Sequence, residues 1–167
     1  MIRKLIYLCL VLLCTLALSA CSSAAPASTT TEGNGSPSVA ADPADRVNLN
    51  TASGDDFVAA IPGLGNRMVR EFMEYRPYLS IRQFRQEIGK YVDDAQVAAY
   101  ESYVYVPIAI NDSDLETLQQ IPGLSAEGAQ ALISARPFAS TDAFLTKLSE
   151  YVSAEEVEIA KAYLGGD

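Results

Sequence analysis

Apolar residues recur at helical spacing in two stretches of the chain that lie 60 residues apart. The first stretch has apolar side chains at Met68, Val69, Phe72 and Met73. The second has small or apolar residues at Gly128, Ala129, Leu132 and Ile133. An i, i+1, i+4, i+5 pattern follows the 3.6-residue period of an amphipathic helix, so we expect a helix at each place.

A shorter helix is expected directly before each of these two. Its apolar face is marked by Val58 and Ile61 in the first stretch, and by Leu115, Leu118 and Ile121 in the second. The side chains able to cap its start are Thr51 or Ser53 in the first stretch, and Asn111 or Ser113 in the second.

Two more helices are expected after each of the longer ones. Proline disfavours helix in the residue before it, so Arg76-Pro77 and Arg136-Pro137 should end the preceding helices. The later helices are predicted near 81–88, 94–104, 141–149 and 154–164, with the N-cap candidates Ser80, Asp93, Ser140 and Ser153. Residues 103–110 alternate like a strand, but their place between the stretches favours an extended connector with inward-facing Val106, Ile108 and Ile110.

These matching helices belong to a longer internal repeat. Shifting the sequence by 60 residues places IPGL at 61–64 on IPGL at 121–124, and the match continues without a gap to Val104. Upstream, VNLN corresponds to IAIN after a slip of one residue. We therefore predict an all-α fold made of two tandem units of four short helices each, residues 46–107 and 108–167. A single unit of this size has little core of its own, so the two are expected to pack together.

The N-terminal residues have the pattern of an export signal. Arg3 and Lys4 precede an apolar run that is too short to span a bilayer comfortably. The run ends in Leu18-Ser19-Ala20-Cys21, which resembles a bacterial lipobox. The resemblance implies removal of residues 1–20 and a thioether-linked diacylglycerol on Cys21. The protein would then be exported and anchored to the bacterial cell membrane. An ordinary signal peptide with an incidental cysteine is the alternative.

Residues 21–45 are expected to form a flexible tether that begins with the lipidated cysteine. Residues 22–45 are mostly Ser, Ala, Thr, Pro and Gly, and such a segment cannot bury enough apolar surface to fold. A coil of this length would hold the folded part about 25–30 Å from the bilayer. Cys9 and Cys14 lie in the segment predicted to be removed, so no intramolecular disulfide is expected.

The stretch VNLNTASGDDFVAAIPGLGNRMVREFMEYRPY, at 47–78, resembles the helix–hairpin–helix module of the ComEA type. Its V-N-[IL]-N-T-A opening and its [LI]-P-G-[IL]-G turn carry the resemblance. The family implies non-catalytic, sequence-independent binding to the backbone of double-stranded DNA, with a possible role in DNA uptake. The positions that would face phosphate are Gly63, Leu64, Gly65, Asn66, Arg67 and Arg70. The family also implies that Leu64 is an inward apolar pin.

The same turn has a physical reason to hold an anion. Pro62 ends the first helix, Gly63 and Gly65 allow positive φ, and the next helix begins at once. The free N–H groups from Leu64 to Arg67 would then point outward at the positive end of a helix dipole. Such a helix start readily binds phosphate.

A PGLG turn is also a compact joint between two helices, so a protein-binding scaffold is the competing hypothesis. The chain resembles, more distantly, the PsbU subunit of photosystem II, an exported protein bound to a protein complex. Residues 21–167 carry 10 basic and 21 acidic side chains, whereas DNA binding rests largely on Lys and Arg. The basic side chains near or after the first hairpin are Arg67, Arg70, Arg76, Arg82 and Arg85.

The second unit has a different turn and a more acidic composition. It reads IPGLS, with Ser125 in place of Gly65 and Glu127 in place of Arg67. Residues 108–167 hold three basic and ten acidic side chains, against seven and eight in residues 46–107. We therefore expect the second unit to keep the fold without the phosphate role.

Catalytic chemistry is not indicated by the sequence. The chain has no histidine, no Gly-x-Ser-x-Gly elbow and no phosphate-binding loop ending in Gly-Lys-Ser/Thr. Adjacent acidic pairs stand at predicted helix starts, where the helix dipole favours them. We expect no enzymatic activity, no cofactor and no metal site. The expected partner is double-stranded DNA or an envelope protein, and the chain itself is expected to be a monomer.

Overall fold

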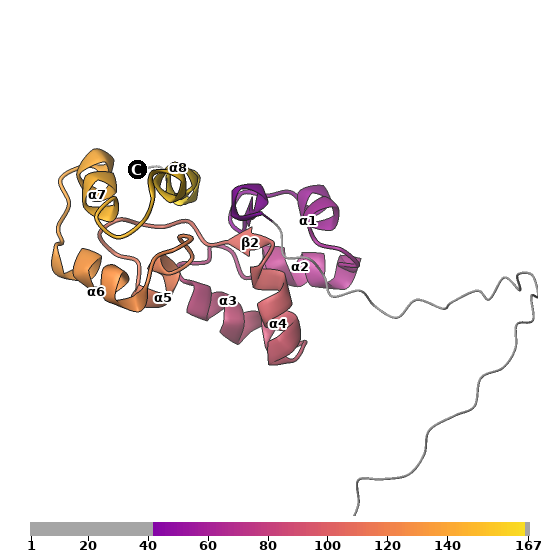
Figure 1. Cartoon of the computed structure of the whole chain (residues 1–167). Helices are drawn as coiled ribbons and strands as arrows, with labels where there is room; N and C mark the ends of the chain where they lie inside the picture. Colours follow the sequence, from indigo (N-terminus) through magenta and orange to yellow (C-terminus); the bar gives the residue numbers. More distant parts are fainter. Residues whose placement is uncertain (1–41, 166–167) are drawn as a thin grey trace, which may run out of the picture. The chain divides into compact units, whose positions relative to one another are not determined.

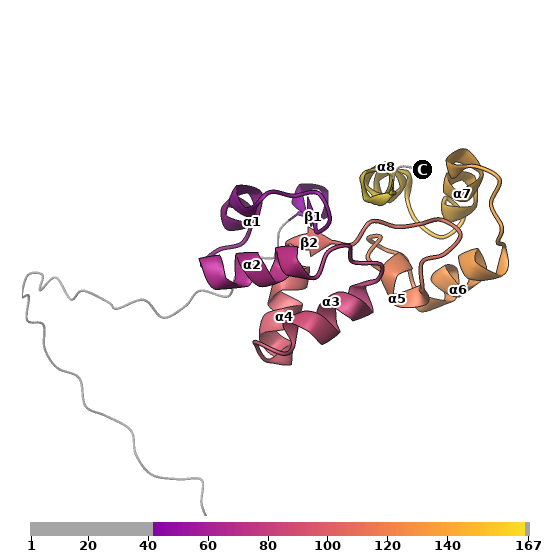
Figure 2. The same cartoon turned by 180° about the vertical axis from the view of Figure 1, so that it is seen from behind.

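The computed structural model describes residues 42–165. The predicted signal peptide, Cys21 and the linker as far as residue 41 lie outside this range. Within it the chain is mostly helical, which confirms the all-α prediction (Figures 1 and 2). The helices of residues 46–107, the first half, are α1 (Gly54–Ala60), α2 (Asn66–Glu74), α3 (Ile81–Ile88) and α4 (Asp94–Glu101). Those of residues 108–165, the second half, are α5 (Leu115–Leu118), α6 (Ala126–Ser134), α7 (Thr141–Leu148) and α8 (Ala154–Tyr163).

Side-chain caps set the start of most helices, as the sequence predicts. The predicted N-caps that accept a backbone N–H of the first turn are Ser53, Ser80, Asp93, Ser140 and Ser153. The cap of α5 was predicted wrongly, because Asp114 accepts the N–H of Thr117. Asn111 and Ser113 lie earlier, in a turn where the Ser113 hydroxyl accepts the N–H of Ala109 at 3.0 Å.

Parallel backbone pairing, a two-strand pair in the first half and a single bridge in the second, joins the beginning of each half to its own end. Strand β1 (Val47–Asn48) pairs in parallel with β2 (Val104–Tyr105), and Ile108 forms a parallel bridge with Leu164. The predicted 94–104 helix is therefore too long, since α4 ends at Glu101 and the chain becomes extended. Val106 and Ile108 of the connector are fully buried, as expected, and Ile110 is half-buried.

The folded part begins earlier than the predicted boundary at residue 46. Residues Pro43–Asp45 form a short 3-10 helix, η1, inside the segment predicted to be flexible. The Tyr163 hydroxyl donates a hydrogen bond of 2.6 Å to the Pro43 carbonyl, which holds η1 against α8. The contact joins residues 120 apart in sequence, so composition alone could not indicate it.

The buried side chains form two clusters, one in each half. In the first cluster Phe72 makes edge-to-face contacts with Phe57, Phe84 and Tyr100, at centroid distances of 5.2–5.4 Å. The second cluster is built mainly of aliphatic side chains around the fully buried Phe144. Leu64 is buried, in agreement with its predicted role as an inward pin.

Two predicted core positions are wrong. Val58 is 48% exposed and Met73 is 44% exposed. Phe57 of α1 and the C-cap Ile61, four residues apart, are buried on one face, and this turns Val58 outward.

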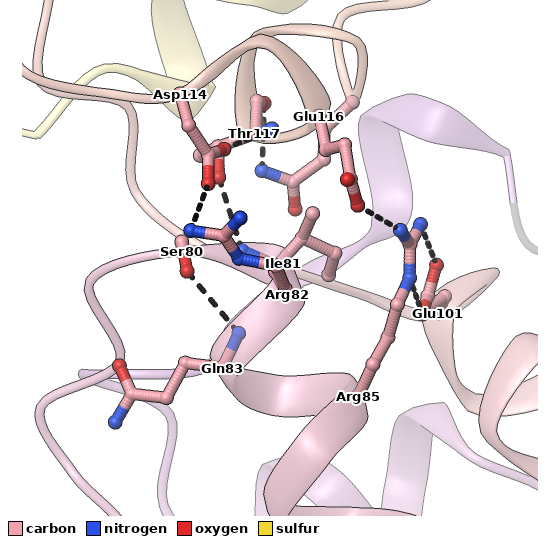
Figure 3. A network of polar contacts seen from close by, with 10 residues as sticks. Ser80, Ile81, Arg82, Gln83, Arg85, Glu101, Asp114, Glu116 and Thr117 are labelled. Carbon is pink, nitrogen blue, oxygen red and sulfur yellow. Dashed lines mark hydrogen bonds and ion pairs between the residues drawn. The ribbon is translucent and has the colours of Figure 1, made fainter.

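Polar contacts between α3 and α5 join the two halves (Figure 3). The Ile81 N–H donates to the fully buried Thr117 hydroxyl at 3.0 Å. Arg85 forms ion pairs with Glu101 at 2.6 Å and with Glu116 at 2.5 Å. Arg82 lies 3.8 Å from the carboxylate of Asp114, the N-cap of α5. Residues 42–165 therefore belong to one packed unit.

None of the helices within residues 42–165 combines the length and the apolar composition that a bilayer span requires.

Candidate nucleic-acid interface

The turn between α1 and α2 has the backbone of a tight, glycine-dependent reversal. Gly63 has φ 73°, and the Leu64 N–H donates to the Ile61 carbonyl at 3.2 Å. Gly65 has φ −82° and ψ 152°, so the expectation that both glycines adopt positive φ is wrong. Gly65 is the N-cap of α2, and N-cap residues ordinarily have this extended conformation.

The start of α2 presents uncapped backbone donors. Gly65 has no side chain to accept a hydrogen bond, and the first bond into the helix is Val69 N–H to the Gly65 carbonyl at 3.2 Å. Within residues 42–165 the N–H groups of Asn66, Arg67 and Met68 have no acceptor. The prediction of free N–H groups from Leu64 to Arg67 holds for Asn66 and Arg67 and is wrong for Leu64, whose N–H is used inside the turn, while the Met68 N–H is free in addition.

Two of the five arginines near the first hairpin are available to an anion. Arg67 and Arg70 are exposed and form no ion pair within the described part of the chain. Arg76 instead donates to the Ala52 carbonyl at 2.6 Å, and burial lowers its pKa. Arg82 and Arg85 are engaged at the junction between the halves.

The acidic side chains around this turn do not neutralise its arginines directly. Glu71 and Glu74 lie on the same helix but pair with neither Arg67 nor Arg70 within 4.0 Å in the described structure. Glu87 pairs with Lys90 instead. The first turn therefore combines free N–H groups with two unpaired guanidinium groups.

The turn between α5 and α6 has the same backbone and a different environment. Gly123 also has φ 73°, and the Leu124 N–H donates to the Ile121 carbonyl at 3.2 Å. Ser125 caps α6 by accepting the N–H of Gly128 at 3.1 Å. The exposed Glu127 follows, as the sequence predicts.

A carboxylate from α8 covers this second turn. A Cβ placed on Gly123 would collide with the carboxylate of Glu156, whereas a Cβ on Gly63 or Gly65 would meet nothing within 4 Å. The same carboxylate completes a capping box with Ser153 at the start of α8. The S-x-x-E pattern identifies the cap, but the contact with Gly123 is tertiary and was missed.

Among the described residues, no group of acidic, cysteine or histidine side chains gathers as a metal site would require. The candidate interface consists of backbone donors, arginines and neighbouring aromatic rings.

No family model, curated protein or solved structure matches the chain. The relation to ComEA-type modules stays a prediction based on the residues quoted above.

Proposed function

We propose that this protein is a non-catalytic DNA-binding protein of the cell envelope, similar to ComEA. In this proposal the start of α2 binds backbone phosphate of double-stranded DNA without reading sequence. The observation that carries the proposal is the uncapped helix start at Asn66–Met68, beside the unpaired Arg67 and Arg70. Such a start combines oriented N–H donors with the positive end of the helix dipole.

Binding of this kind is weak and dependent on salt. One helix start and two arginines supply about two to four phosphate contacts, each of which lowers the logarithmic salt slope by ~0.9. The acidic second half adds a repulsive long-range field. We expect detectable binding only below physiological ionic strength, where screening is reduced.

We further propose that the two halves are copies of one helix–hairpin–helix module with divided roles. The matching turns at Gly63 and Gly123 and the matching strand pairs support this proposal. The second copy would serve the fold, since Ser125 takes one of its N–H groups and Glu156 covers its turn.

The proposed location is the outer face of a bacterial membrane, with a lipid anchor at Cys21. This part rests on the lipobox-like Leu18-Ser19-Ala20-Cys21 alone.

A protein-binding scaffold without nucleic acid is the second candidate. It is favoured by the 75% exposure of Leu79 and by the exposed Val58 and Met73. The net charge of −9 also favours it, because an acidic chain repels DNA.

A binding titration separates the two candidates. Fluorescence anisotropy of a labelled duplex is measured with the full chain in neutral detergent, from ~20 mM salt upward. The proposal expects saturable binding that is equal for unrelated sequences and weakens with salt. Absence of binding at tens of micromolar protein would favour the scaffold.

A further inference from the structure

A pair of tyrosines is linked to the proposed phosphate site through Arg67. Tyr75 follows the last residue of α2, and Tyr91 lies in the turn before α4. Their hydroxyl oxygens are 2.8 Å apart and their ring centroids 6.4 Å apart. Both residues are half-buried, so the pair is a fixed part of the surface.

A cation lies over each ring of this pair. The guanidinium carbon of Arg67 is 5.6 Å from the Tyr91 centroid, and the ammonium of Lys90 is 5.0 Å from the Tyr75 centroid. Such contacts hold a cation over an aromatic face. The four residues form a continuous series of contacts, here called the Arg67–Lys90 ridge, which runs from Arg67 near the start of α2 to Tyr75 after its end.

We propose, resting on the function proposed above, that Lys90 is a further phosphate contact of the same DNA site. Tyr75 and Tyr91 are positioning residues, each of which holds one of the two cations over its ring. The ligand proposed for the ridge is the sugar–phosphate backbone, because a cation lies over one face of each ring and a base cannot stack on that face. In this proposal the partner is duplex DNA, rather than an unpaired strand read by its bases.

A phosphate can replace the acidic side chain that pairs with Lys90. Lys90 pairs with Glu87, but its side chain is 54% exposed and such exposed pairs are weak. Hydrogen bonds with Tyr75 and with Glu71 raise the pKa of the Tyr91 hydroxyl. Arrival of a phosphate would replace Glu87 as the partner of Lys90.

The equivalent surface of the second half has the opposite charge. Sixty residues on, Glu127 corresponds to Arg67, Glu150 to Lys90 and Ala135 to Tyr75. Tyr151 keeps a cation over its ring, but that cation is Lys147, which pairs with Glu150 at 2.6 Å. The ridge thus occurs only in the half whose turn is open, within the described residues.

Lys90→Gln tests the proposal against a matched variant, Lys161→Gln. Both lysines pair with a glutamate three residues away and are about equally exposed, at 54% and 48%. Each variant of the full chain is titrated against a labelled duplex at several salt concentrations. Lys90→Gln should weaken binding about 3–10-fold at ~30 mM salt and reduce the logarithmic salt slope by ~0.9. Lys161→Gln should change the affinity less than about twofold and leave the slope unchanged.

Glu87→Gln provides a second measurement that does not remove the lysine. It frees Lys90 from its partner, so binding should tighten about 2–3-fold, while Glu158→Gln should have a smaller effect. A single strand of the same length should bind no more tightly than the duplex. If Lys90→Gln leaves affinity and slope unchanged while the hairpin still binds, the ridge proposal is overturned and the proposed function stands. If the wild-type chain binds no duplex, both are overturned.

Discussion

The carboxylate of Glu156 lies against Gly123 in the turn before α6, while the equivalent Gly63 before α2 faces open space. The two turns have the same φ of 73° and the same internal hydrogen bond. The two turns therefore differ in the side chains near them and not in their backbone conformation. This contrast underlies the proposal that the first turn binds an external anion, whereas the second is already covered by the carboxylate of Glu156.

Alanine substitutions at the two glycines should differ in their effect on stability. Gly63→Ala places a Cβ at positive φ in open space and should lower the free energy of unfolding by about 1–2 kcal/mol. Gly123→Ala must also displace the flexible Glu156 carboxylate from its hydrogen bond with the Ser153 N–H, and should lower it by about 1.5–3 kcal/mol. Urea unfolding of the two variants gives the comparison. Glu156→Ala should cost less in the Gly123→Ala background than in the wild type, because that hydrogen bond is already lost there, and equal losses at the two glycines would contradict the described contact.

A serine at position 65 should separate stability from binding. Gly65 has φ −82° and free space around it, so Gly65→Ser can cap α2 as Ser125 caps α6. The free energy of unfolding of the variant should rise by a few tenths of a kcal/mol, because serine caps slightly better than glycine. It should weaken DNA binding about twofold or more, since the serine takes the N–H of Met68. Thermal unfolding and anisotropy measure the two effects.

The reciprocal variant is the control for this prediction. Ser125→Gly should lower the free energy of unfolding by a few tenths of a kcal/mol and leave DNA binding unchanged. A Gly65→Ser variant that binds DNA as tightly as the wild type would show that the free N–H groups are not used.

Stability should be nearly constant from pH 6 to 9 and should fall at higher pH. The chain has no histidine to titrate in the neutral range. Burial raises the pKa of Tyr78, Tyr100, Tyr105 and Tyr163 above the ordinary value of 10.0. A raised folded-state pKa means that the stabilising contribution is complete below the unfolded pKa of about 10 and is lost as pH rises above it.

Urea unfolding at pH 7, 9 and 11 measures this dependence. Each tyrosine that stays neutral in the folded state can contribute up to about 1.4 kcal/mol of loss per pH unit above 10. Tyr78 should contribute most, since its hydroxyl is buried without a hydrogen-bond partner in the described structure. Tyr78→Phe should reduce the loss of unfolding free energy between pH 9 and 11, and an unchanged loss would exclude this tyrosine as its cause.

The helices were predictable because their signals are local. The period of α2 and the caps Ser80 and Ser153 depend on residues a few positions apart, and these signals gave the correct elements. The outward turn of Val58 and the docking of Pro43 on α8 depend on partners distant in sequence, which a single chain does not reveal.

The candidate site was predictable in its position and only partly in its geometry. The PGLG motif located the turn, and Gly63 has the expected positive φ. The extended conformation of Gly65 follows from its place as the N-cap, which requires the boundary of α2 to be known. The cover on Gly123 and the position of Lys90 over Tyr75 arise from packing between helices.

The anchor is tested by replacing the proposed lipidated residue. Cys21→Ser should block lipidation and leave an uncleaved precursor, because the lipobox reading requires the thiol. Mass spectrometry of protein extracted from membranes measures both the cleavage site and the modification. Cleavage at another position, with an unmodified Cys21 in the wild type, would contradict the anchor.

The central claim is tested most directly by reversing the charge at the start of α2. Arg67→Glu combined with Arg70→Glu is compared with Lys147→Glu combined with Lys161→Glu, which changes the net charge by the same amount in the second half. Circular dichroism confirms that both variants keep their helicity, and anisotropy with a labelled duplex is then measured at ~30 mM salt. The account predicts that the arginine variant loses at least about 30-fold in affinity, and that the lysine variant loses less than about threefold. Equal losses would mean that only net charge matters, and would contradict a phosphate site at this turn.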